Sequence, residues 1–238
     1  MTDVVISGTG LYTPPDAISN DELIEAFNTW VNRENEKNAE AIAAGEKEPL
    51  ARSSSEFIEK ASGIYSRYVI NREGVLDPDR MVPVIPEREN EDLSVQCEMS
   101  LHAARGALAQ AQVDPVQVDM IIVACSNMQR PYPAMAIEIQ QYLGSEGYGY
   151  DMNVACSSAT FGIKAATDAI RSGSARRVLM VNPEICSGHL NFRDRDSHFI
   201  FGDACTAVLL EDAAVARRKN GYKVLGCQLW THFSNHIR

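Results

Sequence analysis

Cys156 is the residue whose type and position could most readily do chemistry. It lies in the stretch YDMNVACSSATFGIKAATDAIRSG, residues 150–173, where a short strand-like segment passes into a long, almost uncharged helical pattern. The amino end of a helix supplies partial positive charge and unpaired N–H groups, which favour a reactive thiolate. The same N–H groups could hold an acyl oxyanion, and the small residues 157–159 would let a substrate approach. The pattern therefore indicates a nucleophile for acyl transfer.

The same cysteine also has a purely structural interpretation. Free cysteine is among the most buried residue types, and a tight junction between a strand and a helix suits a small apolar side chain. From this segment alone, a buried cysteine and an attacking thiol both stay open.

Strand-like and helical patterns alternate along the rest of the chain. Strands are expected at 3–8, 118–125, 150–155, 176–184, 199–212 and 222–233, and helices from about 20 and at 55–62, 91–112, 133–143 and 156–172. Apolar strands without alternation belong to a sheet that is covered on both faces, so the fold class is α/β. Helix 156–172 is charged only at Lys164, Asp168 and Arg171, and we expect it to be buried between layers.

Local signals set some boundaries of these elements. Ser19 or Asn20 can cap the first helix, and Gly63 and Gly144 are expected to end two later ones. Residues 31–50 are rich in Ala and Glu, which predicts a solvated helical insertion, and the proline-containing residues 71–90 predict an irregular loop.

Composition narrows the classes of partner. The chain has 238 residues and a net charge of −10, which argues against bulk attraction to nucleic acid or an anionic membrane, so an acidic partner needs a local basic patch. No segment reaches the roughly 20 apolar residues of a membrane span, and the amino-terminal residues lack the pattern of a signal peptide. The six cysteines are scattered, without a CxxC pair or zinc-like spacing. We therefore expect reduced thiols, no metal and a cytoplasmic protein.

Five ordered segments resemble the type III, chain-initiating β-ketoacyl-ACP synthases of the thiolase superfamily. DMNVACSSATFGIKAATDAIRSG is similar to the nucleophile segment of that family, and GTGLYTP to its opening strand and turn. SEFIEKASGIYSRYV resembles its acyl-CoA-binding segment, RPYPAMAIEIQQYLG its dimer-interface helix, and DRDSHFIFGDACTAVLLE the strand after its active-site loop. The resemblance covers nearly the whole chain.

The resemblance implies a thiolase-like layered fold. Its sheet would be mixed, mostly parallel and five-stranded, with helices on both faces. Residues 1–220 would form the first of two similar halves, with insertions near 28–52 and 74–90, and residues 221–238 would begin the second half.

The resemblance also implies a reaction. Cys156 would take the acyl group of acyl-CoA, or of acyl-ACP, as a thioester. Malonyl-ACP would then lose CO₂ and attack this thioester to give 3-oxoacyl-ACP, in fatty acid synthesis. Acyl-CoA and acyl carrier protein are thus the expected partners of a homodimer, with coenzyme A thioester as substrate and no further cofactor.

Five further residues fall on family positions that bind substrate. Phe57 and Arg195 would hold the CoA adenine between an aromatic ring and a cation. Tyr132 would reach across the dimer to the floor of the partner subunit's acyl pocket. Ser126 and Ile200, at strand ends, would line that pocket.

Several positions depart from the family. Ala61 replaces the usual CoA-binding arginine and Asp196 replaces a glycine, which should weaken the binding of ordinary acetyl-CoA. The family's catalytic His and Asn are expected beyond Arg238, because His232, Asn235 and His236 precede that region. Two alternatives therefore stay open: a condensing enzyme of the polyketide or quinolone type, and a non-catalytic subunit that binds acyl carriers. The retained Cys156 argues against the second.

Overall fold

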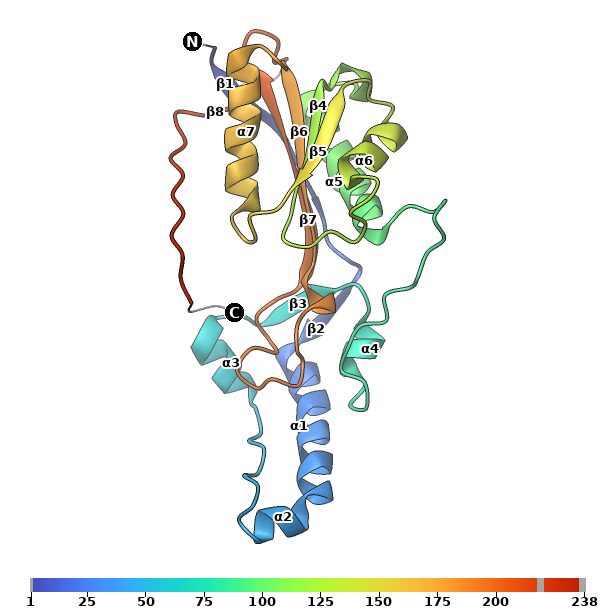
Figure 1. Cartoon of the computed structure of the whole chain (residues 1–238), viewed down its shortest axis with the longest axis vertical. Coiled ribbons are helices and arrows are strands. Elements are labelled where there is room, and N and C mark those ends of the chain that lie inside the picture. Colours follow the sequence, from blue (N-terminus) through green and yellow to red (C-terminus); the bar gives the residue numbers. More distant parts are fainter. Residues whose placement is uncertain (1, 218–220, 236–238) are drawn as a thin grey trace. The chain divides into compact units, whose positions relative to one another are not determined.

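A computed structural model describes residues 2–217 and 221–235 of the chain (Figure 1). The chain divides into two compact units. The first, which we call the sheet unit, comprises Met1–Tyr12, Leu93–Pro183 and Cys205–Arg238. The second, the helical unit, comprises Thr13–Asp92 and Glu184–Ala204.

One mixed sheet organises the sheet unit. Among the described residues it has six strands in the order β5-β4-β6-β7-β1-β8. Their bounds are β1 Val4–Tyr12, β4 Met120–Ala124, β5 Tyr148–Met152, β6 Arg177–Ile185, β7 Asp203–Asp212 and β8 Tyr222–Lys223. β4 pairs in parallel with β5 and β6, whereas β1 pairs antiparallel with β7 and β8. The predicted mixed α/β sheet is confirmed, and Tyr222–Lys223, within the expected strand 222–233, adds β8 to its five strands.

Helices cover both faces of this sheet (Figure 1). The helices are α5 Val95–Ala111, α6 Met135–Leu143 and α7 Ser158–Ser172, and a 3₁₀ turn, η1, spans Pro115–Gln117. Successive side chains of a strand point to opposite faces. Met120, Ile122 and Ala124 of β4 accordingly pack in one core with Ala166 and Ile170 of α7. The other face of β4 is turned toward α5 and α6, so all five β4 residues are buried.

α7 is less buried than its sequence predicts. Its buried residues are Ser158, Gly162, Ala166, Thr167 and Ile170, which lie along one face, and most of its other residues are half-buried. The prediction of burial between two layers is therefore wrong for the described residues. The sheet covers one face of the helix, and no second layer within the described part of the chain covers the other.

The helical unit contains a short two-stranded sheet that the sequence analysis missed. β2, Asp16–Ser19, pairs antiparallel with β3, Ser66–Val69. The helices of this unit are α1 Asn20–Lys37, α2 Ala39–Ala43, α3 Ser55–Ser62 and α4 Arg72–Leu76, with a 3₁₀ turn, η2, at Cys186–Gly188. A core of large apolar side chains holds them together, among them Leu23, Phe27, Ile58, Phe192 and Phe199.

The predicted caps are present. The side chain of Ser19 accepts from the backbone N–H of Glu22, and the Glu22 carboxylate accepts from the backbone N–H of Ser19, which closes a capping box. Gly63 and Gly144 end α3 and α6 with φ of 73° and 74°. These values lie in the left-handed region that glycine adopts without strain.

Several predicted boundaries are wrong, and three of them are strand ends with a shared cause. Residues 199–202 precede β7 as a loop, and only Tyr222 and Lys223 of the expected strand 222–233 pair with β1. β5 ends at Met152, three residues earlier than expected. In each case the apolar pattern continues past the last residue that has a hydrogen-bonding neighbour strand, and pairing rather than composition sets the end of a strand.

β1 and α5 approach each other unusually closely. An ideal Cβ added at Gly10 would lie 1.8 Å from the carbonyl oxygen of Ala103, and one at Gly8 would lie 2.1 Å from that of Ala107. Backbone atoms cannot rotate away as a flexible side chain can, so a larger residue would push the helix off the strand.

We predict that Gly10→Ala lowers the free energy of unfolding by about 3 kcal/mol, because the added methyl group overpacks a backbone contact. Urea unfolding measures this change. Gly106→Ala is the matched control, since its Cβ would meet only the Cα of Gly10 at an ordinary 3.5 Å, and alanine favours the helix. Equal effects of the two substitutions would contradict the explanation.

Candidate active site

A tight turn, residues 153–157, joins β5 to α7 and carries Cys156. α7 begins at Ser158, two residues later than predicted, with Ser157 as its N-cap. Ala155 has φ of +46°, in the left-handed region that costs an L-residue roughly 1–2 kcal/mol. Such a conformation persists only where the surroundings impose it, and it often marks a functional turn.

Two side chains hold this turn. The hydroxyl of Ser158 accepts from the N–H of Val154 at 2.8 Å and donates to the carbonyl oxygen of Ala155 at 2.7 Å, and it lies 3.3 Å from the carbonyl oxygen of Cys125. The Asn153 side chain accepts from the N–H of Ala155 at 2.9 Å. Sequence reasoning missed both roles. The available signals were an asparagine two residues before a positive φ and a serine at the first helical position.

The N–H groups that directly follow Cys156 are already used by the turn. Ser157 N–H donates to the Val154 carbonyl oxygen and Ser158 N–H to that of Ala155, each at 3.0 Å. These two N–H groups are therefore not open to an acyl oxyanion, and the expectation of an oxyanion site at the helix start stays a prediction for the other N–H groups there. The Ser157 and Ser158 N–H groups stabilise the turn that presents the thiol.

Cys156 is exposed, which decides against a buried structural cysteine. Cys97, Cys125 and Cys205 are buried, and Cys186 and Cys227 are half-buried. All six cysteines lie in the described part of the chain. The Cys97 thiol lies 2.8 Å from a carboxylate oxygen of Glu138, and burial together with this carboxylate raises the pKa of the Cys97 thiol.

Phe57 and Arg195 come together in the helical unit, as their predicted shared role requires. The guanidinium carbon of Arg195 lies 4.0 Å from the centroid of the Phe57 ring. Arg195 Nε also donates to the carbonyl oxygen of Arg52 at 2.8 Å, and its guanidinium pairs with Asp196. Two layers in van der Waals contact need about 7 Å, so a base would have to displace one of the two groups to lie between them.

The remaining predicted site residues lie on loops. Ser126 follows β4, and its carbonyl oxygen accepts from the side-chain amide of Asn153 at 2.7 Å, which ties it to the turn before Cys156. Tyr132 belongs to the sheet unit and is 91% exposed. Ile200, in the helical unit, is about half exposed and precedes β7. Ser126 and Ile200 are therefore near strand ends but not within strands.

The sequence analysis also named His232, Asn235 and His236. His232 and Asn235 are exposed and lie outside helices and strands, and His236 lies outside the described residues. Within residues 2–217 and 221–235, no three His, Cys, Asp or Glu side chains are grouped so that they could hold a metal ion. None of the described helices has the length and apolar character to cross a bilayer.

We predict that iodoacetamide labels Cys156 first. Its thiol is exposed at the start of a helix, whereas Cys97 has a raised pKa and is buried. Peptide mass mapping after brief labelling should find the adduct on the peptide that contains NVACSSATF, with Cys186 and Cys227 as internal controls of intermediate exposure. First labelling of Cys97 or Cys125 would contradict this order.

The chain is similar to known proteins. A family model of 3-oxoacyl-[acyl-carrier-protein] synthase III matches residues 150–232, which include the turn and α7. A beta-ketodecanoyl-[acyl-carrier-protein] synthase of Pseudomonas aeruginosa is 63% identical over 215 residues, which are 90% of this chain and 61% of that protein.

Solved structures give the same result for the fold. The 3-oxoacyl-[acyl-carrier-protein] synthase III of Aquifex aeolicus has a TM-score of 0.64 and 25% identity over 87% of this chain and 53% of its own. The priming β-ketosynthase of the R1128 polyketide pathway has a TM-score of 0.65 and 26% identity over 90% of this chain and 51% of its own.

The chain thus spans about half the length of the proteins it matches. Over that span, an α/β sheet with helices on both faces leads through a strained turn to an exposed cysteine. The chain belongs to the 3-oxoacyl-[acyl-carrier-protein] synthase III family, with a thiolase-like fold.

Proposed function

We propose that the protein containing this chain condenses an acyl-CoA starter with malonyl-ACP to give 3-oxoacyl-ACP in fatty acid synthesis. The observation that carries the proposal is the exposed Cys156 on its strained turn, inside the segment that the family model matches. A turn that costs folding energy and presents a thiol to solvent is what a nucleophile requires.

The proposed reaction has two steps. In the first, the Cys156 sulfur forms a bond to the acyl carbonyl carbon, the bond to the CoA sulfur breaks, and CoA leaves as the thiol. In the second, malonyl-ACP loses CO₂, and its carbanion forms a carbon–carbon bond to the acyl carbon. The bond to Cys156 then breaks, and the sulfur returns to its starting state. A His and an Asn of a second half, beyond Arg238, would stabilise the carbanion as an enolate.

The relative with 63% identity suggests the length of the donor. Its printed name specifies a beta-ketodecanoyl product, which has ten carbons in its acyl chain. Malonyl-ACP contributes two carbons after decarboxylation, so the matching donor is an eight-carbon acyl-CoA. Ala61 and Asp196, which depart from the family pattern, are consistent with a donor other than acetyl-CoA.

We further propose that Phe57 and Arg195 hold the CoA adenine. Their 4.0 Å contact supports a shared role, and it implies that the base displaces Arg195 from the ring and stacks in its place or between the two groups. Tyr132, which is almost fully exposed, would enter the acyl pocket of the partner subunit in a homodimer, and Ser126 and Ile200 would line the acyl pocket.

A second candidate is priming of another pathway. The structural similarity to a priming β-ketosynthase of polyketide synthesis favours this candidate. That similarity is one of fold, and it extends over about half of the ketosynthase chain. The second candidate uses the same acyl-Cys156 step and differs only in the acceptor. A non-catalytic partner subunit is disfavoured, because such a subunit has no use for the exposed cysteine.

We predict that octanoyl-CoA adds one octanoyl mass per chain to the full-length protein, on the peptide containing Cys156, and that malonyl-ACP then removes it as 3-oxodecanoyl-ACP. Intact-protein and peptide mass spectrometry follow both steps. Cys156→Ala should abolish the adduct and the product but preserve the fold, whereas Cys227→Ala, at another partly exposed cysteine, should change neither.

Two outcomes would count against this assignment. If the Cys156→Ala variant kept full condensing activity, Cys156 would not be the nucleophile. If the octanoyl group were transferred to a different acceptor and not to malonyl-ACP, the second candidate function would be favoured.

We also predict that Phe57→Ala and Arg195→Ala each raise the KM for octanoyl-CoA about tenfold, and that the double variant is less impaired than the product of the two effects. Both residues would act on one ring, so each loses its partner when the other is removed. Steady-state kinetics on the two single variants and the double variant measure the coupling. Fully multiplicative effects would mean that the residues do not share a ligand.

A further inference from the structure

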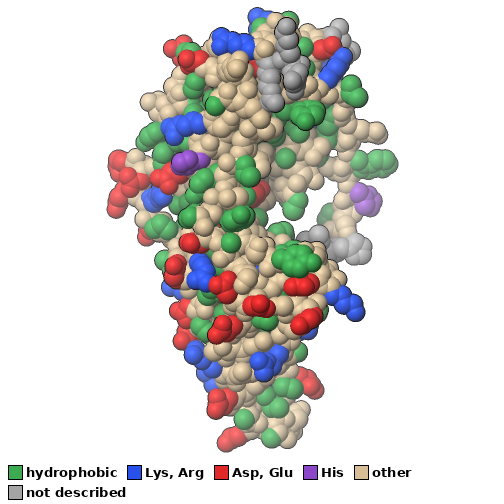
Figure 2. Space-filling view, turned by 180° about the vertical axis from the view of Figure 1, so that it is seen from behind, with side chains coloured by type: hydrophobic (Ala, Val, Ile, Leu, Met, Phe, Trp, Pro, Cys, Tyr) green, Lys and Arg blue, Asp and Glu red, His purple; other side chains and the backbone are tan. Residues whose placement is uncertain are grey.

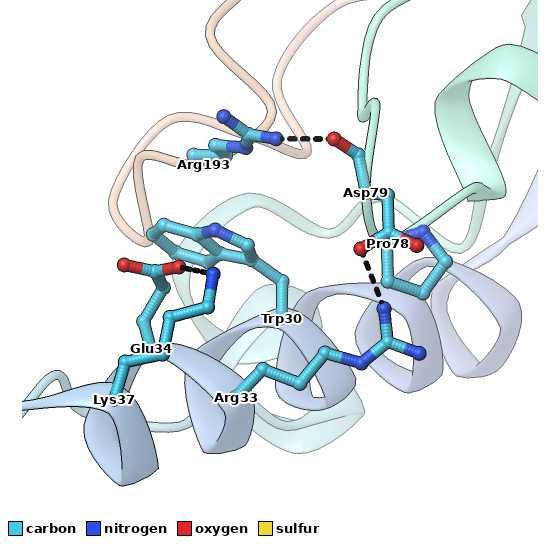
Figure 3. Close-up of a pocket in the computed structure, with 7 residues that line it drawn as sticks. All are labelled: Trp30, Arg33, Glu34, Lys37, Pro78, Asp79 and Arg193. Atoms are coloured by element: carbon cyan, nitrogen blue, oxygen red, sulfur yellow. Dashed lines mark hydrogen bonds and ion pairs between the residues drawn. The ribbon is translucent and has the colours of Figure 1, made fainter.

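The helical unit contains a pocket that the proposed reaction does not use (Figure 3). It has a volume of about 250 Å³, and it is lined by Trp30, Arg33, Glu34, Lys37, Pro78, Asp79 and Arg193. Four of these residues lie on α1 and two on the loop after α4, which are the segments that the sequence analysis assigned to insertions. We call this site the Trp30 pocket.

An aromatic face and three cations meet in the Trp30 pocket (Figure 3). The Arg193 guanidinium lies 5.6 Å from the centroid of the Trp30 ring and donates to the carbonyl oxygen of Asp79 at 2.8 Å. Arg33 pairs with the Asp79 carboxylate at 2.7 Å, and Lys37 pairs with Glu34 at 2.7 Å. Three cations thus face two carboxylates.

The five charged side chains that line the Trp30 pocket carry a net charge of +1. The protein as a whole carries −10, and red and blue side chains are interspersed around α1 and α2 rather than separated (Figure 2). A local excess of cations is what an anionic ligand requires on an acidic protein.

The ion pairs of the pocket can be exchanged. The Arg33 side chain is 47% exposed and that of Asp79 is 81% exposed, and ion pairs this exposed contribute little to stability. The Arg33–Asp79 pair is made through one guanidinium nitrogen, whereas a phosphate can accept two parallel hydrogen bonds from a guanidinium, so it could replace Asp79 on Arg33 and also reach Arg193. The size of the pocket suits a phosphate and part of a sugar, but it is below the range for a whole nucleotide.

The pocket adjoins the proposed adenine site through one loop. The Arg193 guanidinium lies over the Trp30 ring and that of Arg195 over the Phe57 ring. The two arginines are two residues apart in the sequence, so their Cα atoms lie within about 7 Å of each other. Asp194 fixes the loop between them. Its side chain accepts from the Asp196 N–H at 3.1 Å and from the Ser197 hydroxyl at 2.6 Å. The two arginines therefore present two cation–aromatic pairs at a fixed separation.

We propose that the Trp30 pocket binds the ribose 3′-phosphate of the acyl-CoA donor. This proposal rests on the proposed function, because it assumes that adenine stacks at Phe57 and Arg195. Arg193 and Arg33 supply the phosphate contacts, and they replace the cation that is absent at Ala61, an exposed residue of α3. The insertions thus change how the enzyme holds its nucleotide without changing the nucleophile.

The test compares CoA with 3′-dephospho-CoA by isothermal calorimetry on the full-length protein. We expect the unmodified protein to bind CoA about tenfold more tightly, as the loss of a charge-assisted hydrogen bond predicts. Arg193→Gln and Arg33→Gln should each bring this ratio close to one and leave the affinity for 3′-dephospho-CoA unchanged. Arg105→Gln removes the same charge from the exposed side of α5 in the sheet unit and should preserve the tenfold ratio.

Several outcomes would overturn the proposal. An equal affinity of the unmodified protein for the two ligands excludes a 3′-phosphate site, and a preserved ratio in both pocket variants places that site elsewhere. Adenosine 3′,5′-bisphosphate serves as a second probe that needs no acyl chemistry. If its binding depends on Arg193 but octanoyl transfer is absent, the pocket stands and the proposed reaction fails.

Discussion

The candidate active site depends on one constraint, the left-handed backbone of Ala155. Ala155 directly precedes Cys156, and its left-handed backbone belongs to the turn on which the thiol is exposed. The Ser158 hydroxyl opposes the strain by bonding both sides of the turn, and Asn153 ties the same turn to the loop after β4. The chemistry is thus held by a serine and an asparagine that never need to touch a substrate.

The sequence predicts this fold well where local and tertiary signals agree. Ser19, Gly63 and Gly144 end their helices as expected, because caps act within a few residues of chain. The two-stranded sheet of β2 and β3 was missed for two reasons. Four-residue strands with polar residues carry no periodic signal, and these strands are defined by pairing between segments nearly 50 residues apart. Ala155 was missed for a similar reason, because its strain is imposed by neighbours and not by its own preference.

The residues of the candidate site could be predicted from the sequence, but their contacts with one another could not. Cys156 stood out by type and position, and Phe57 and Arg195 were paired through family resemblance. That Arg195 already covers the Phe57 ring could not be read from the sequence, and neither could the use of the Ser157 and Ser158 N–H groups within the turn. Trp30 lies in the helix expected from about residue 20 and had no role of its own in the sequence analysis, yet it forms a second cation–aromatic pair with Arg193 of the same loop as Arg195.

The pairing of β1 has a consequence for synthesis of the chain. Its partners are β7 and β8, so Val4 lies opposite Asp212 and Ser7 bonds to Leu209 across 202 positions. A ribosome that adds roughly 5–20 residues per second needs about 10–40 s to supply those partners. Until then the first strand can pack on helices, on α5 through Gly8 and Gly10 and on α7 through Val4, but the edge that pairs with β7 stays open. The nascent chain therefore passes through a period in which its earliest strand is vulnerable to wrong pairing, and completion of this sheet is a late event in folding.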